Sequence, residues 1–357
     1  LPFLIFVLIV GRIPPSAFIP YYFIFFTSTL LYHFTGLVAG MISKRWRWSA
    51  RISMMLIFLL YFVLPNFSHL GLVFLEFLTV RPTFTEQIVP IIGMNTDFQM
   101  EGLGLMAGKS VPFFTAEISG TLFSFIIQSG LICLFAAIVA RKWKADTVPA
   151  LSKPLSILTF AVFVIMCLGN IWPNLTKSEK ALNILQSGGS VPAEAIVTVI
   201  PLLLTVTSLA LLFVLMTTAL PDPMEFKHGR IRADRLGLTH LSRWEDSSSG
   251  YLFTSIAFIV QAAMLFVVFY TMDKAGYYEE VGMSPVTGFW MILASGLSLF
   301  YFQGLKENFG ASRLAMFALL SWALPILAAI LIMAIGQSEE LIGVTLLTTA
   351  LSPIMII

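Results

Sequence analysis

IVTVIPLLLTVTSLALLFVLMTTAL, residues 196–220, is a run of 25 residues without a charged side chain. A helix needs about 20 apolar residues to cross the hydrocarbon core of a bilayer. Only helices and closed barrels satisfy their own backbone hydrogen bonds there. The run lacks the alternation of apolar and polar residues that membrane strands show. It therefore predicts a transmembrane helix.

Further runs of the same kind lie along the whole chain, and residues 1–10 resemble the end of a truncated one. The seven complete runs are residues 17–41, 52–64, 118–139, 155–171, 251–272, 289–302 and 314–335. Charged residues make up 11% of the chain, against about 25% in soluble domains. The composition excludes a water-soluble globule. The sequence predicts an all-α polytopic membrane protein with about nine spans.

The connections between these runs differ in charge. Fifteen of the 21 Lys and Arg residues fall in connections 42–51, 140–154, 221–250 and 303–313, and six fall in the alternate ones. Basic residues concentrate on the cytoplasmic side of membrane proteins. We therefore place the basic connections in the cytoplasm and predict a multi-pass protein of the plasma (inner) membrane. The formal net charge is only +2, and we expect no nucleic-acid partner.

Two shorter apolar runs, 70–80 and 341–351, have 11 residues each. A helix of that length extends about 17 Å and cannot cross about 30 Å of hydrocarbon. We predict that both are re-entrant segments entering from the outer face. Because similar spans and loops precede them, residues 1–83 and 251–355 look like two copies of one unit. Internal repeats are common in transporters; the alternative is chance likeness between apolar segments.

The order of the segments resembles that of permease subunits of ATP-binding-cassette exporters. Those have six spans, an inner amphipathic segment after the second span, and a re-entrant segment after the fifth. Here Leu241-Ser242-Arg243-Trp244-Glu245, followed by Gly250, is similar to a short element of these permeases. His240 and Tyr251 stand where that element usually has Pro and Lys.

The resemblance implies a fused pair of half-permeases, of which this chain is the middle part. Residues 1–154 would hold the third to sixth spans of the first unit. Residues 155–357 would hold the first to fifth spans of the second, with a cytoplasmic coupling loop at 221–250. The implied function is the permease component of an ATP-driven exporter, which forms the translocation pathway and couples to a separate ATPase subunit. The alternative is a non-transporting membrane scaffold subunit of a larger complex, associated with further membrane subunits.

The loop 221–250 contains the residues expected to contact the ATPase at the cytoplasmic face. We expect a helix from about Arg230, interrupted near Gly237, in which Arg232 and Arg235 share one side. The alternative is an amphipathic segment that lies on the membrane surface. The expected coupling residues are Arg230, Arg232, Arg235, Leu241, Arg243, Trp244 and Glu245.

Few polar residues lie inside the apolar runs. Glu76, Gln128 and Gln261 are candidates for a pathway or gate, since polar groups in membrane segments are costly and often functional. The alternatives are an interfacial anchor for Glu76 and interhelical hydrogen bonding for the two glutamines. Gly36 and Gly40 form a Gly-x-x-x-Gly pattern, which lets a second helix approach closely. We expect it to serve helix packing.

The sequence contains no pattern typical of an enzyme or a metal site. No two of the four histidines are three or four residues apart, the spacing of a helical metal-binding pair. Residues 104–110 resemble a phosphate-binding loop, but Leu103 stands where such a loop needs Gly. We expect no catalytic activity, no metal and no cofactor in this chain.

Overall fold

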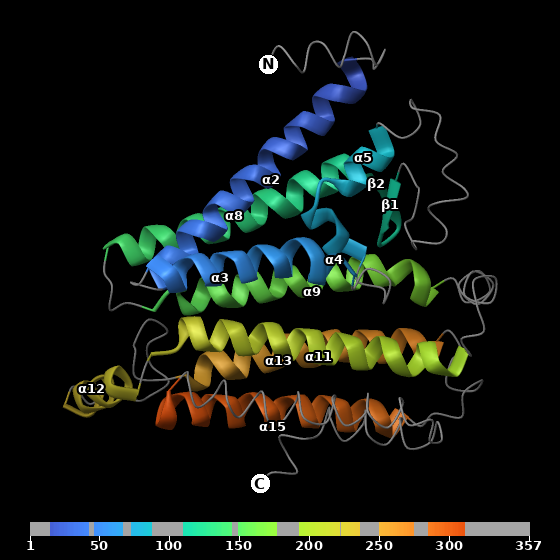
Figure 1. Ribbon diagram of the computed structural model, residues 1–357. Coiled ribbons are helices and arrows are strands. Elements are labelled where there is room, and N and C mark those ends of the chain that lie inside the picture. Colours follow the sequence, from blue (N-terminus) through green and yellow to red (C-terminus); the bar gives the residue numbers. More distant parts are fainter. Residues whose placement is uncertain are drawn as a thin grey trace, which may run out of the picture. The chain divides into compact units, whose positions relative to one another are not determined.

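The computed structural model describes residues 15–42, 46–66, 73–87, 110–144, 149–176, 193–221, 223–235, 250–274 and 285–310. This part of the chain is mostly helical (Figure 1). Five helical stretches are long and apolar enough to cross a membrane: Ile19–Met41, Gly120–Lys144, Lys153–Trp172, Tyr251–Lys274 and Gly288–Phe309. They indicate a membrane-embedded protein, as the composition predicts. The predicted span 314–335 and the short run 341–351 lie outside the described residues.

The chain forms two compact units, each described by itself. Unit 1 comprises Leu1–Asp146 and Met166–Asn174, and unit 2 comprises Thr147–Ile165 and Leu175–Ile357. The helix α9 (Lys153–Thr176) contributes to both.

Unit 1 is built on the long helix α2 (Pro15–Ile42). The next helix in the chain is α3 (Trp46–Phe58). A π-helical turn, η1 (Leu59–Val63), joins α3 to the short helix α4 (Leu64–Asn66). This π-helical turn ends two residues before Pro65, which has no N–H to donate. The helix predicted for residues 52–64 begins six residues earlier than expected, at Trp46.

Two glycines of α2 face two serines of α3. A Cβ atom on Gly36 or Gly40 would lie 3.6 Å from the Oγ of Ser53 or Ser49 respectively. Small residues on both helices thus let α2 and α3 pack closely and antiparallel, because Gly40 meets the earlier serine. The Gly-x-x-x-Gly pattern faces a helix of the same chain.

The third long helix of unit 1 is α8 (Gly120–Lys144), which runs beside α2 in the same direction. Phe23 and Phe125 have ring centroids 5.1 Å apart. About one turn further along each helix, the Thr27 hydroxyl donates a hydrogen bond to Gln128, which shows that α2 and α8 are parallel. The last turn of α8 is basic, with Arg141, Lys142 and Lys144.

The connection from α4 to α8 contains short elements. A 3-10 helix, η3 (Val73–Leu78), is followed by α5 (Arg81–Gln87). At about 2 Å per residue, six residues of 3-10 helix extend about 12 Å, too little to cross a membrane. This agrees with the predicted short segment 70–80, whose entry from the outer face stays a prediction.

The prediction of helix from residue 118 is wrong at its start, because residues 110–119 form a β-hairpin. Strands β1 (Ser110–Phe113) and β2 (Ala116–Ser119) are antiparallel, with Ser110 opposite Ser119. Phe114 at the turn has φ 52°, and its N–H donates to the Gly169 carbonyl of α9 over 2.7 Å. A predicted all-α chain thus contains a two-stranded sheet in its described part.

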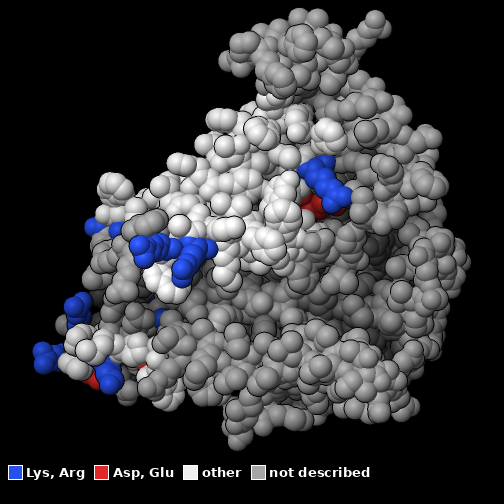
Figure 2. Space-filling view, viewed as in Figure 1, with Lys and Arg blue, Asp and Glu red and all other residues white. Residues whose placement is uncertain are grey.

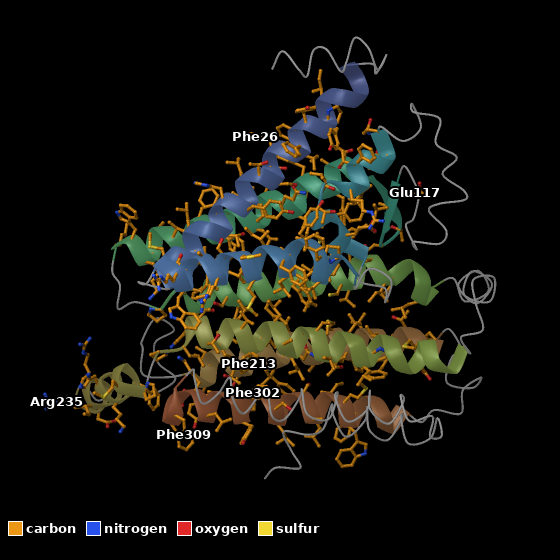
Figure 3. All side chains as sticks on the ribbon, viewed as in Figure 1. Phe26, Glu117, Phe213, Arg235, Phe302 and Phe309 are labelled. Carbon is orange, nitrogen blue, oxygen red and sulfur yellow. The ribbon has the colours of Figure 1, made fainter. Side chains whose placement is uncertain are left out.

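Unit 2 contains the helices α11 (Ala193–Ala219), α12 (Pro223–Arg235), α13 (Tyr251–Lys274) and α15 (Pro285–Phe309). Glycines of α15 receive phenylalanine rings of α13: Phe258 lies over Gly296 and Phe269 over Gly288, so the two helices are antiparallel. The C-terminal ends of α11 and α15 lie side by side. There Phe213 and Phe302 point toward one another, and their ring centroids are 5.4 Å apart (Figure 3).

Candidate functional site

The helix α12 holds three of the predicted coupling residues, Arg230, Arg232 and Arg235. It begins at Pro223, seven residues before the predicted start, and ends at Arg235, two residues before Gly237. Proline favours the first helical position, because its missing N–H would have no partner there and its φ is already helical. Pro223 therefore marks the start of this helix in the sequence. Leu241, Arg243, Trp244 and Glu245 lie outside the described residues.

The surface of α12 is both basic and apolar. Lys227, Arg232 and Arg235 are exposed, and so are Met224 and Ile231, at 71% and 50%. Met224 and Ile231 are seven residues apart and share one face, flanked by Lys227 and Arg235. Basic side chains stand out at the surface of unit 2 over α12 (Figure 2). Such a face can bind an acidic, partly apolar partner surface.

The end of the loop after α12 is fixed to α15 by a buried carboxylate. The Gly250 N–H donates to Oε1 of Glu307 over 3.1 Å, and Nε2 of Gln303 donates to the same oxygen over 3.0 Å. The Gly250 carbonyl accepts the N–H of Thr254, the first bond of α13. Glu307 therefore caps α13 from another helix, where a negative charge near the N-terminus is favourable.

Both ends of the loop 221–250 lie against this cap. A Cβ atom on Gly250 would lie 2.6 Å from Oε1 of Glu307 and 3.2 Å from a methyl carbon of Leu220. A larger residue at this position would require the Glu307 carboxylate to shift and the Leu220 side chain to give way. We call Leu220, Gly250, Gln303 and Glu307 the loop base.

The beginning of α12 rests on the end of α15. Gly310 closes α15 with φ +83°, and its N–H donates to the Lys306 carbonyl over 3.0 Å. A Cβ atom on Gly310 would lie 3.5 Å from the ring of Pro223, the first residue of α12. Lys306 and Glu307 are buried. The first residue of α12 therefore lies next to the glycine that closes α15.

Of the three predicted pathway or gate residues, Gln128 is fully occupied by hydrogen bonds. Its Oε1 accepts from Thr27 Oγ1 (2.6 Å) and Ser28 Oγ (3.0 Å) of α2. Its Nε2 donates to the carbonyls of Phe77 (3.2 Å) and Thr79 (3.3 Å). Gln128 thus joins α8, α2 and the end of η3, which is the interhelical bonding that the sequence left as an alternative.

Glu76 and Gln261 lie in different units. Glu76 lies in η3 of unit 1 and is buried, next to the turn that leads to Arg81. Gln261 lies in α13 of unit 2 and is fully buried. Neither its Nε2 nor its Oε1 has a hydrogen-bond partner in the described part of the chain.

Sequence reasoning missed two carboxylates that cap helices. Glu307 caps α13, and Glu86 of α5 caps α8, since its Oε2 accepts the N–H (2.8 Å) and the hydroxyl (2.9 Å) of Thr121. Gln303 and Glu307 have i,i+4 spacing at the end of an apolar run, which is a signal that was available. No such signal pairs Glu86 with Thr121, which is 35 residues away.

The described residues contain no group of three or more His, Cys, Asp or Glu side chains placed to hold a metal ion. No protein-family model, curated protein or solved structure matches the chain. Interpretation of the loop base therefore depends on its own geometry.

Proposed function

We propose that this chain is a permease component of an ATP-driven exporter and that a separate ATPase subunit docks on α12 from the cytoplasm. The observation that carries the proposal is the attachment of α12. Its exposed basic and apolar face is joined, through Pro223 and the loop base, to the ends of three long helices. A docking element must transmit force to the spans, and an element that only rests on a membrane need not.

The proposed mechanism is alternating access. The partner's ATP-driven movement would displace α12, and the loop base would pass the displacement to α13 and α15 together. The seam between these helices is formed by glycines under aromatic rings, Gly288 and Gly296. These two contacts are between a ring and a glycine and involve no hydrogen bond, so α13 and α15 can part here while Gly250 and Glu307 stay bonded at the loop base.

The test is capture of ATPase activity with the affinity-tagged chain from its native membranes. The double variant Arg232→Glu/Arg235→Glu should lose the ATPase, because both exposed guanidinium groups change sign. The matched control is Arg51→Glu/Lys144→Glu, which reverses two exposed basic residues of unit 1 and should keep the ATPase. Equal capture by both variants would remove the docking role and favour the scaffold alternative.

A further inference from the structure

The two buried glutamines of the long helices differ in their bonding. Gln128 has four partners, whereas Gln261, also fully buried, has none for either atom of its amide among the residues that the structure describes. A polar group removed from water without a partner is destabilising, and more so in a membrane. Gln261 lies in the middle of α13 and its amide is unbonded within the described residues, so it can bond a partner from outside them.

Unpartnered polar atoms continue from Gln261 toward the loop base. Thr254 is seven residues earlier, on the same face of α13 and about 10 Å closer to its start. Within the described part of the chain, its Oγ1 also has no partner, and neither does Oε1 of Gln303 on α15. All three side chains are at most 1% exposed.

The register of α13 and α15 places these groups in one seam. Gly250 meets Glu307, Phe258 meets Gly296 and Phe269 meets Gly288. The same antiparallel register puts Thr254 level with Gln303, and Gln261 level with Ser295. Ser295 is fully buried, and its hydroxyl donates to the Ile292 carbonyl over 2.8 Å. Its oxygen thus remains an acceptor.

The groups in this seam are amides and hydroxyls, with a charged residue only at its end, where Lys306 and Glu307 lie. An amide offers both donors and an acceptor, so it suits a neutral partner that also donates and accepts. A charged ligand would be poorly matched, since a buried charge needs an opposite charge or several aligned dipoles.

We propose that the seam between α13 and α15 binds the uncharged, hydrogen-bonding part of an amphiphilic substrate through Gln261, Thr254 and Gln303. This inference rests on the proposed transport function and names its substrate class. The seam is closed in this structure, because all three side chains are buried. Parting of α13 and α15 would expose them, rarely in the isolated chain and in every cycle of alternating access.

The first experiment uses a thiol in the seam and three probes of equal chain length. In a chain with Cys133→Ala and Cys167→Ala, Thr254→Cys should react slowly with maleimide in lipid nanodiscs. Octanamide should slow that reaction roughly fivefold, the effect of about one hydrogen bond. Octanoate and octylamine should not slow the reaction with maleimide. Adding Gln261→Leu should remove the octanamide protection. Val268→Cys, equally buried two turns beyond Gln261, should show no octanamide effect.

Equal protection by all three probes, or protection that survives Gln261→Leu, would overturn the proposal. These measurements need no ATPase. Lost octanamide protection with intact ATPase capture would therefore refute the seam alone, and lost capture with intact protection would refute the exporter function alone.

The second experiment compares thermal unfolding of Gln261→Leu and Gln128→Leu. Gln128→Leu should lower the Tm by several degrees, because it leaves the Phe77 and Thr79 carbonyls unpartnered. Gln261→Leu should keep or raise the Tm, because its amide makes no bond within the described chain. An equal fall in both Tm values would assign Gln261 a structural role and overturn the proposal.

Discussion

At the scale of single residues, glycine and carboxylate occur together at two helix starts. Gly120 begins α8 and Gly250 precedes α13, and Cβ atoms on them would lie 3.0 and 2.6 Å from carboxylate oxygens of Glu86 and Glu307. In both cases the missing side chain lets a carboxylate from another helix reach the free N–H groups. A capping residue from the same chain segment would be visible in a sequence, whereas these acceptors come from distant residues.

The substitution Gly250→Ala tests this arrangement. The new methyl group would displace the Glu307 carboxylate, so the bonds to the Gly250 N–H and to Gln303 would be weakened. We expect a loss of about 1–3 kcal/mol of stability, the cost of leaving buried hydrogen-bonding groups unpaired. Denaturant or thermal unfolding in detergent would measure it.

Gly304→Ala is the matched control, since it lies on α15 and a Cβ atom there meets nothing within 4 Å. Alanine is about 1 kcal/mol better than glycine inside a helix, so this variant should be slightly more stable. If Gly250→Ala also gained stability, the close approach of Glu307 to α13 would be disproved.

At the scale of elements, α13 and α15 pack by placing rings on glycines. A Cβ atom on Gly296 would lie 2.6 Å from the Phe258 ring, so Gly296→Leu should push the helices apart. Overpacking of this kind costs typically 1–3 kcal/mol. The corresponding change Gly130→Leu on α8, where a Cβ atom meets nothing within 4 Å, should leave the Tm nearly unchanged. Similar Tm values for both variants would contradict the close packing of the Phe258 ring on Gly296.

The sequence was sufficient to locate the long helices but not the elements between them. An uncharged run such as 196–220 has only one stable form in a bilayer, so α11 follows from composition alone. The hairpin was missed because its strands are four residues each and include Pro112, which is typical of a loop. Its position depends on the bond from Phe114 to Gly169, a contact between distant segments.

The candidate site was predictable to the same limited degree. Charge indicated α12, since the basic residues of 221–250 stand out in an apolar chain. The residues that hold the loop after α12 in place could not be predicted from charge, because Glu307 and Gly250 are 57 residues apart in the chain. Likewise, Gln128 and Gln261 look alike in the sequence, because each is a single amide within an apolar run. Only the neighbouring Thr27, Ser28 and the η3 carbonyls distinguish them.

At the scale of the whole molecule, each unit has an end at which basic residues gather. In unit 1 the end of α8 and the start of α3 are basic, with Lys144 and Arg51 exposed, whereas Glu117 lies on the hairpin before α8. In unit 2 the basic helix α12 follows the end of α11, whereas Asp273 and Lys274 lie at the end of α13. Such asymmetry sets orientation in a membrane.

Labelling of single cysteines from each side of the membrane tests the predicted orientation. Lys144→Cys and Lys227→Cys should react with a membrane-impermeant maleimide only from the cytoplasm, and Glu117→Cys and Lys274→Cys only from outside. All four positions are exposed, so lack of reaction from one side reports sidedness and not burial. Reaction of Glu117→Cys from the cytoplasm would invert unit 1 and reject the parity of the basic connections.

The cap on α13 also has a consequence for biosynthesis. A growing chain emerges from the ribosome in order, so Gly250 and α13 are made before Glu307 exists. Until α15 follows, the first N–H of α13 lacks the acceptor that it has in the finished protein. The two helices are therefore expected to mature in the bilayer as a pair, and nascent chains that stop short of Glu307 should leave the start of α13 open to hydrogen exchange.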